Sequence, residues 1–130
     1  MSRYQRNAGA TSSLRYHLVW CPKYRRPVLT PHDVRLKEII AEVATEAGMI
    51  IHALEVMLDH VHLLVEVGPT LAVAEIVNRF KGRSSRLMQS EFPALRSRLP
   101  TLWSRSYYAR SVEHVSAETV RAYIAAQKGV

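Results

Sequence analysis

The chain has 130 residues, 48% of them apolar, and carries 18 Lys and Arg side chains against 11 Asp and Glu. This length favours a single domain, and this apolar content excludes a disordered chain. The net charge of +7 favours a polyanionic partner, with nucleic acid preferred to a membrane surface, although a merely soluble basic protein can have the same charge. We expect a flexible basic arm over residues 1–13 and one domain over residues 14–130.

The single cysteine and the length of the apolar stretches indicate in which cellular compartment the chain is expected. Because Cys21 is the single cysteine, the chain cannot form an intrachain disulfide, which fits a reducing cytoplasm. No apolar stretch approaches the roughly 20 residues that span a bilayer, so we expect no membrane partner.

The first half of the chain predicts a strand, a helix and a hairpin. Leu14–Cys21 is rich in β-branched, aromatic and apolar residues, as strands are. After a basic connection, Thr30 can cap a helix that Gly48 is well suited to end. Met49–Met57 and His60–Val67 then read as two strands whose short separation predicts an antiparallel hairpin.

The second half predicts a helix, a strand and a final helix. Thr70 can cap the second helix, in which Gly82 lowers helical propensity. Gln89–Pro100 is expected to be irregular, Leu102–Val112 to form a fourth strand, and Ser116 to cap the last helix. This order predicts an α+β fold of the ferredoxin-like βαββαβ type, with an antiparallel sheet and an added C-terminal helix.

Two histidines open the second strand of the hairpin. His60 and His62 are two residues apart, so a strand places both imidazoles on one face. Neutral imidazoles can bind a divalent metal or polarise a phosphate, although surface or core histidines give the same pattern. Asp59 can either hydrogen-bond one of these histidines or cap the turn.

The last predicted helix carries a second polar pair. Tyr123 and Gln127 are four residues apart and therefore share a helix face. A phenol with a pKa of about 10 is a poor nucleophile unless a metal activates the phosphate that it attacks. Gln127 could add an oxygen ligand, but the pair taken alone favours a packed tyrosine and a solvated glutamine.

Several stretches, in this order, resemble the small single-tyrosine HUH transposases of the IS200/IS605 family. They are Tyr16–Arg25, Glu55–Leu64, Phe80–Arg86, Leu102–Tyr107 and Tyr123–Gln127. Leu58 departs from the family, which commonly has proline before Asp-His, and this departure concerns the shape of a turn.

The resemblance implies a metal-dependent DNA transposase. By resemblance, His60, His62 and Gln127 bind Mg²⁺ or Mn²⁺. Tyr123, on a catalytic C-terminal helix, attacks single-stranded DNA and leaves a 5′-phosphotyrosine link and a free 3′-OH. The implied partners are DNA hairpins at the ends of an insertion sequence and a second copy of the chain, with which the C-terminal helix can exchange. The implied setting is the cytoplasm of a prokaryotic cell.

Basic residues are the candidates for contacts to DNA phosphates. Arg79, Arg83 and Arg86 recur on one side of the second predicted helix, at spacings of four and three. Lys81 belongs to the same helix, and two more basic residues lie in the connection after the first strand. The candidates are Arg79, Lys81, Arg83, Arg86, Lys23 and Arg25.

Two alternatives stay open. One is a domesticated relative that acts on chromosomal palindromic repeats. The other is a ferredoxin-like nucleic-acid-binding module without catalysis, which would stack bases on aromatic side chains of its sheet. A covalent adduct with single-stranded DNA separates an enzyme from a binding module.

Overall fold

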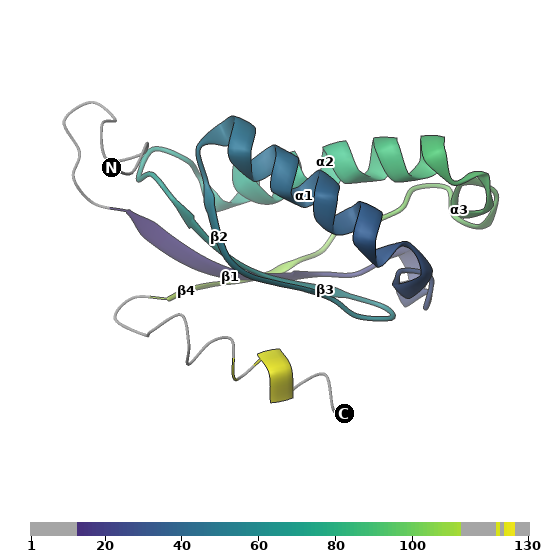
Figure 1. The fold of residues 1–130 in the computed structure, drawn as a ribbon, viewed down its shortest axis with the longest axis horizontal. Coiled ribbons are helices and arrows are strands. Elements are labelled where there is room, and N and C mark those ends of the chain that lie inside the picture. Colours follow the sequence, from purple (N-terminus) through teal and green to yellow (C-terminus); the bar gives the residue numbers. More distant parts are fainter. Residues whose placement is uncertain (1–12, 113–121, 123, 127–130) are drawn as a thin grey trace.

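The computed structural model describes residues 13–112, Ala122 and residues 124–126. The elements are β1 (Leu14–Trp20), η2 (Lys23–Arg25), η3 (Thr30–His32), α1 (Asp33–Ala47), β2 (Ile50–Val56), β3 (Val61–Val67), α2 (Val73–Glu91), α3 (Pro93–Arg98) and β4 (Tyr108–Ser111). The four strands form one antiparallel sheet in the order β2-β3-β1-β4, and α1 and α2 lie together on one of its faces (Figure 1). This arrangement confirms the predicted βαββαβ plan.

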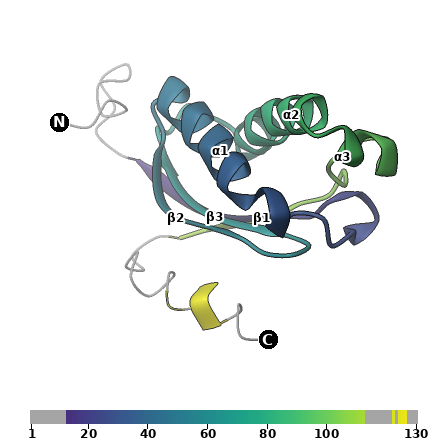
Figure 2. The same ribbon diagram turned by 45° about the vertical axis from the view of Figure 1, so that its right-hand side comes forward.

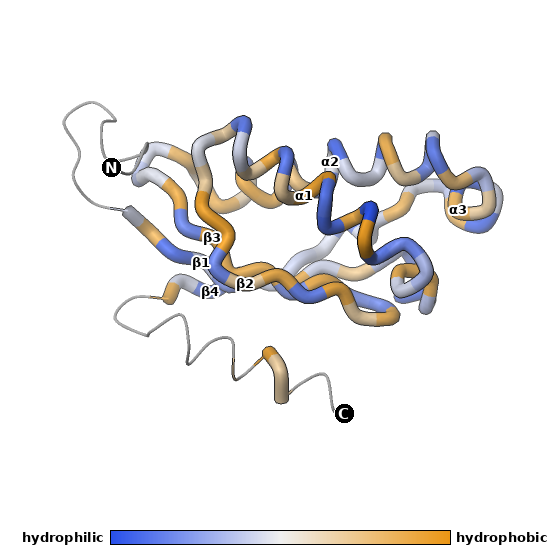
Figure 3. The backbone as a smooth tube through the Cα atoms, viewed as in Figure 1, coloured by the Kyte–Doolittle hydropathy of each residue, from blue (hydrophilic) through white to orange (hydrophobic). Residues whose placement is uncertain are grey.

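The face of the sheet beneath the helices forms the main core. Strand alternation sends Leu18 and Trp20 of β1 and Leu63 of β3 to this face, and all three are essentially inaccessible to solvent. The Trp20 ring stacks on Phe80 of α2 at 6.2 Å between centroids and meets the edge of Trp103 at 5.9 Å. Apolar and polar residues alternate along the strands as well as along α1 and α2 (Figure 3).

The other face of the sheet carries a smaller apolar cluster. It consists of Leu64 of β3, Val112 just after β4, and Ile124, which is 1% exposed. In both ribbon views, the short helical piece that contains Ile124 lies on the side of the sheet away from α1 and α2 (Figures 1 and 2). The described end of the chain therefore packs on the face that the helices leave open.

The hairpin prediction is confirmed, and so is the helix end at Gly48. β2 pairs with β3 in antiparallel fashion, and Gly48 ends α1 with a φ of 72°, a conformation that glycine adopts without a Cβ clash. The predicted helix starts are wrong. Thr30 lies in η3, so that His32 precedes α1, and Ala72 rather than Thr70 precedes α2.

The irregular stretch predicted over Gln89–Pro100 is also wrong. Helix α2 continues to Glu91, and α3 follows at once. The small polar residues of α2 do not interrupt it, because the Ser84 hydroxyl donates to the Phe80 carbonyl at 2.6 Å and accepts a hydrogen bond from Trp103 Nε1 at 2.9 Å. Packing has overridden propensity here.

The fourth strand is shorter than predicted. β4 begins at Tyr108, and Trp103 forms an isolated bridge with Pro22 instead of joining the strand. Ser116, Tyr123 and Gln127 lie outside the described residues. None of the described helices combines the length and apolar character needed to cross a bilayer.

Candidate active site

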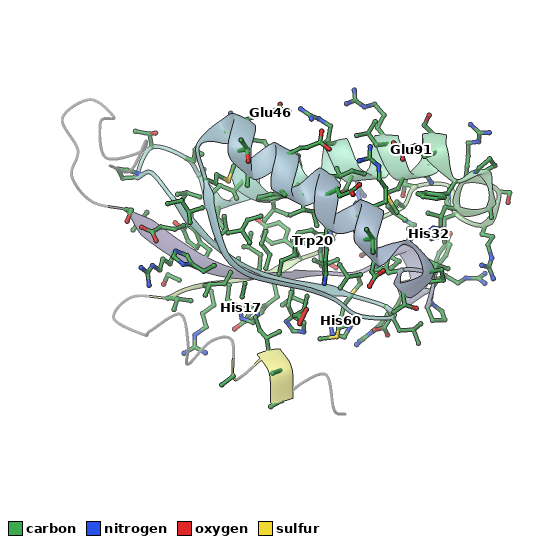
Figure 4. All side chains as sticks on the ribbon, viewed as in Figure 1. His17, Trp20, His32, Glu46, His60 and Glu91 are labelled. Carbon is green, nitrogen blue, oxygen red and sulfur yellow. The ribbon has the colours of Figure 1, made fainter. Side chains whose placement is uncertain are left out.

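The predicted histidine pair lies on the open face of the sheet. His60 directly precedes β3 and His62 is its second residue. Their ring centroids are 4.7 Å apart at an interplanar angle of 77°, so the rings share a face as strand alternation requires. Figure 4 shows His60 and His17 on the side of the sheet opposite Glu46, which belongs to α1.

The turn of the hairpin holds His60 in place. The backbone N–H of Met57 donates to the His60 carbonyl at 2.8 Å, which closes the hairpin. The N–H of Leu29 donates to the carbonyl of Leu58 at 3.1 Å and ties the turn to the connection before α1. The side chain of Leu58 is 52% exposed, consistent with its position in the turn.

Asp59 joins His60 to a basic residue of η2. His60 Nδ1 lies 2.7 Å from Asp59 Oδ1, and Arg25 Nε donates to Asp59 Oδ2 at 3.0 Å. Partial burial opposes ionisation of Asp59, but the hydrogen bonds from His60 and Arg25 outweigh it and lower the pKa of this carboxyl. An ionised Asp59 accepts the Nδ1 proton, so a neutral His60 keeps its lone pair on Nε2.

His62 is more deeply placed than His60. It is 6% exposed, and its Nδ1 atom lies 3.2 Å from Nε2 of His17, whose ring is nearly parallel to it with the centroids 5.4 Å apart. Burial and the neighbouring imidazoles of His60 and His17 lower the pKa of His62 to about 4, so it is neutral at pH 7. Among the described residues, the buried Nε2 atom of His62 has no hydrogen-bond partner.

His17 was absent from the predicted site. Burial, followed by the charge of Arg110, lowers the pKa of His17, so this imidazole is neutral as well. It reaches His62 because β1 and β3 are neighbours that set Val19 opposite His62. The period-two pattern of β1 indicates which residues share a face with His17, but the contact depends on strand order and register.

The two histidines fit part of a metal site. With both Nδ1 atoms engaged, the Nε2 atoms of His60 and His62 are the available donors, and imidazole nitrogen suits divalent transition metals. Within the described part of the chain, no group of three or more His, Cys, Asp or Glu side chains could hold a metal ion. The third predicted ligand, Gln127, lies outside the described residues.

The predicted arginine row of α2 lies in the helix layer rather than beside the histidines. Arg79, Arg83 and Arg86 line a groove between α1 and α2 together with Glu46. The guanidinium of Arg83 donates to both carboxylate oxygens of Glu46, at 2.7 and 3.1 Å, and Arg79 pairs with Glu75 at 3.3 Å. DNA would have to compete with these carboxylates.

The other basic residues predicted to contact DNA have different surroundings in the structure. Lys81 Nζ donates to the carbonyls of Ser104 and Arg105 at 2.6 and 3.3 Å, and burial lowers its pKa. Lys23 Nζ lies 5.6 Å from the centre of the Tyr24 ring. Arg25, through Asp59, is the member of this set that the structure connects to His60.

The η2 turn has an uncommon backbone. Tyr24 and Arg25 have φ values of 60° and 51°, in the left-handed region that residues with a Cβ rarely occupy. Tyr24 is 68% exposed, while the Arg25 side chain pairs with Asp59. This turn therefore presents an aromatic ring and basic side chains next to the histidine pair.

The chain is similar to known DNA transposases over most of its length. A family model described as "Transposase IS200 like" matches residues 10–127. The ISDra2 transposase TnpA of Deinococcus radiodurans is 36% identical over 126 residues, covering 95% of this chain and 90% of that protein. The transposase for insertion sequence element IS200 of Salmonella typhimurium is 30% identical over 101 residues, covering 75% of this chain and 66% of that protein.

Two solved structures have the same fold. A crystal structure of a transposase candidate from Deinococcus radiodurans R1 aligns with a TM-score of 0.76 and 37% identity, covering 93% of this chain and 95% of that one. A REP-associated tyrosine transposase bound to a REP hairpin aligns with a TM-score of 0.62 and 13% identity, covering 85% of this chain and 62% of that one. At 13% identity the likeness concerns the fold alone.

Proposed function

The chain belongs to the family of IS200-like transposases, and from this membership we propose that it cleaves and rejoins single-stranded DNA through a tyrosine nucleophile. The observation that carries the proposal is the pairing of His60 and His62 on the open face of the sheet. Each ring has its Nδ1 atom in a hydrogen bond, which leaves the lone pair of Nε2 to bind a metal ion. Such a pair is suited to a metal-assisted reaction at a phosphate.

The proposed ligands of Mg²⁺ or Mn²⁺ are His60, His62 and Gln127. When bound, the ion would supply positive charge to the oxygens of the scissile phosphate. Hydrogen bonds orient the first of these ligands: Asp59 holds the His60 ring, and Arg25 holds Asp59. Imidazole ligands favour Mn²⁺ over Mg²⁺ more than carboxylates do.

Tyr123 is the proposed nucleophile. Its hydroxyl gives up a proton and its oxygen forms a bond to phosphorus, while the bond from phosphorus to the 3′ oxygen breaks and that oxygen takes up a proton and leaves as a 3′-OH. Attack by another 3′-OH on the phosphotyrosine releases Tyr123 and joins two strands. One phosphodiester replaces another, so the exchange needs no nucleotide hydrolysis. The neighbouring Ile124 packs against Leu64, two residues beyond His62 on the same sheet face, which supports this choice.

We propose DNA hairpins at the ends of an insertion sequence as the substrate, in the cytoplasm of a prokaryotic cell. A tyrosine transposase of the same fold is bound to a REP hairpin, which supports a hairpin partner. Arg25 and Lys23 are candidates for phosphate contacts near the histidines, because they follow β1 at the same end of the site. Arg79, Lys81, Arg83 and Arg86 are candidates for contacts on the helix layer.

A labelled oligonucleotide tests the proposed chemistry. Since the 5′ phosphate stays on the protein, a hairpin oligonucleotide labelled at its 3′ end should migrate with the wild-type chain on a denaturing gel when Mn²⁺ is present. Tyr123→Phe should form no adduct, whereas the control Tyr16→Phe, on β1, should form it normally. An adduct formed by Tyr123→Phe would overturn the assignment of the nucleophile.

A homodimer with shared active sites is the proposed assembly. Mixing Tyr123→Phe with the double variant His60→Ala, His62→Ala tests it, since a heterodimer with composite sites has one site with both halves intact. Adduct formation should then return in a mixture of two inactive parents. Two parents that stay inactive after verified subunit exchange would instead place Tyr123 in the site of its own subunit.

A further inference from the structure

We infer that His17 is a positioning residue that accepts the Nδ1 proton of His62 and thereby presents the Nε2 lone pair of His62 to the proposed metal. The inference rests on the proposed function for what His62 binds. The hydrogen bond and the tautomer that it selects concern the metal-free chain and can be tested there.

The contact between the two rings is short, buried and internal to the sheet. His17 Nε2 and His62 Nδ1 are 3.2 Å apart, and the rings are nearly parallel at an interplanar angle of 13°. His17 is 7% exposed and His62 is 6% exposed, so water has little access to either ring. A buried hydrogen bond of this kind restricts both ring orientation and tautomer.

Two tautomers could make this hydrogen bond. If His17 Nε2 donated, His62 would carry its proton on Nε2, leaving a buried N–H group without an acceptor among the described residues. If His62 Nδ1 donates, Nε2 keeps a lone pair instead. Buried N–H groups without partners are rarer in proteins than under-used acceptors, so the geometry favours the second arrangement.

His60 has the same arrangement with a different acceptor. The Asp59 carboxylate accepts its Nδ1 proton at 2.7 Å, as carboxylates commonly do behind metal-binding histidines. His17 offers a neutral nitrogen in the corresponding place behind His62. In both rings Nδ1 has a hydrogen-bond partner, and the two ring centroids are 4.7 Å apart.

Strand β4 braces His17 from the side away from His62. The register sets Arg110 opposite His17, and the Tyr108 ring meets the edge of the His17 ring at 6.1 Å between centroids. His17 therefore has packing partners on both neighbouring strands. This explains how an imidazole, which has no charge to hold it, keeps the orientation that His62 needs.

The tautomer can be read directly by NMR of the full chain without metal. A two-bond ¹H–¹⁵N spectrum of ¹⁵N-histidine protein at pH 7.5 distinguishes protonated from lone-pair nitrogens, and His62→Gln assigns the signals of His62. We expect His62 to be protonated on Nδ1. Protonation of His62 on Nε2 would overturn the inference, whether or not the chain binds metal.

Paired substitutions test positioning through metal affinity, with Mn²⁺ alone as the probe and calorimetry or electron paramagnetic resonance as the readout. His17→Leu removes the acceptor and should weaken Mn²⁺ binding by about 10- to 100-fold. His17→Gln places an amide oxygen near the former Nε2 atom and should restore most of the affinity. His32→Leu, which replaces an imidazole that packs against Phe92, is the matched control and should bind as wild type does.

The possible failures are distinguishable. Equal Mn²⁺ affinity in wild type and a folded His17→Leu would overturn the inference while leaving the metal proposal intact. Absence of Mn²⁺ binding by the wild type would overturn the metal proposal, and the NMR spectrum would still decide the tautomer. If His17→Leu does not fold, the NMR result and the affinity of His17→Gln decide, since loss of binding in a folded His17→Gln would contradict rescue by an acceptor.

Discussion

On the face of the sheet that α1 and α2 cover, β1 and β3 bury Leu18, Trp20 and Leu63 against the helices. On the other face, the same two strands bring His17 and His62 together within hydrogen-bonding distance. The helix-covered face therefore contains apolar side chains, whereas the other face combines a small apolar cluster around Leu64 with two buried imidazoles, and among the described residues the Nε2 atom of His62 has no hydrogen-bond partner. Because successive side chains of a strand point to opposite faces of the sheet, a substitution on one face can be tested without altering the side chains of the other.

The largest expected effect is on the imidazole face. His60→Ala or His62→Ala should abolish strand cleavage while hairpin binding persists, because either change removes a proposed metal ligand and leaves the basic residues in place. Cleavage and gel-shift assays in Mg²⁺ and in Mn²⁺ measure the two activities, with His32→Ala as the control. Full cleavage by either variant would contradict the metal assignment.

A substitution on the apolar face should lower the stability of the fold instead. Trp20→Ala removes a ring that packs against Phe80 and Trp103, and should lower the free energy of unfolding by about 3–5 kcal/mol. Urea denaturation followed by circular dichroism measures this loss. A Trp20→Ala chain as stable as the wild type would show that the aromatic cluster is not the main packing centre.

A smaller effect is expected from pH. The pKa of His62 is lowered from 6.5 to about 4 by burial and its neighbours, so below pH 6.5 the unfolded chain binds a proton that the folded chain excludes. His62 therefore makes no pH-dependent contribution above 6.5 and destabilises the fold as pH falls towards 4. Urea titrations from pH 7.5 to pH 4 should show a steeper loss in wild type than in His62→Phe. Parallel curves would contradict the burial of a neutral His62.

The alternation pattern and the element order could be predicted from sequence, but the contacts between elements could not. His60 and His62 share a face through spacing alone, whereas the contact of His17 with His62 needs the β1–β3 register. Likewise, the spacing of the arginines on α2 gives no sign of Glu46, which belongs to α1 and meets Arg83 only when the two helices pack. α3 was missed because prolines suggested a break where one instead starts a helix.

The smallest effect concerns the arginine row in the helix layer. If Arg79, Arg83 and Arg86 contact DNA phosphates, each alanine substitution should reduce the slope of log affinity against log salt by about 0.7 for single strands. Arg35→Ala, which removes an arginine paired with Glu91 in the same layer, is the control. An unchanged slope in the triple variant would show that these three arginines do not contact DNA phosphates.

Glu46→Gln sharpens that comparison. This substitution replaces the carboxylate that pairs with Arg83 by a neutral amide. If Arg83 contacts phosphate, the DNA affinity should increase modestly. Fluorescence anisotropy at several salt concentrations measures the change. Unchanged or weaker binding would indicate that the ion pair, rather than DNA contact, is what Arg83 provides.

The most direct test of the proposed chemistry is to locate the covalent bond to DNA. After reaction with a hairpin oligonucleotide and digestion with nuclease and trypsin, mass spectrometry identifies the peptide that carries the nucleotide. Cleavage after Arg121 and Lys128 releases Ala122–Lys128, in which Tyr123 is the single tyrosine. We predict a 5′-phosphonucleotide on this peptide, formed by the wild type with Mn²⁺ and absent without metal or in His62→Ala. A nucleotide on a different tyrosine peptide, or no covalent product from a chain that still cuts the DNA, would contradict a tyrosine-123 mechanism at the histidine face of the sheet.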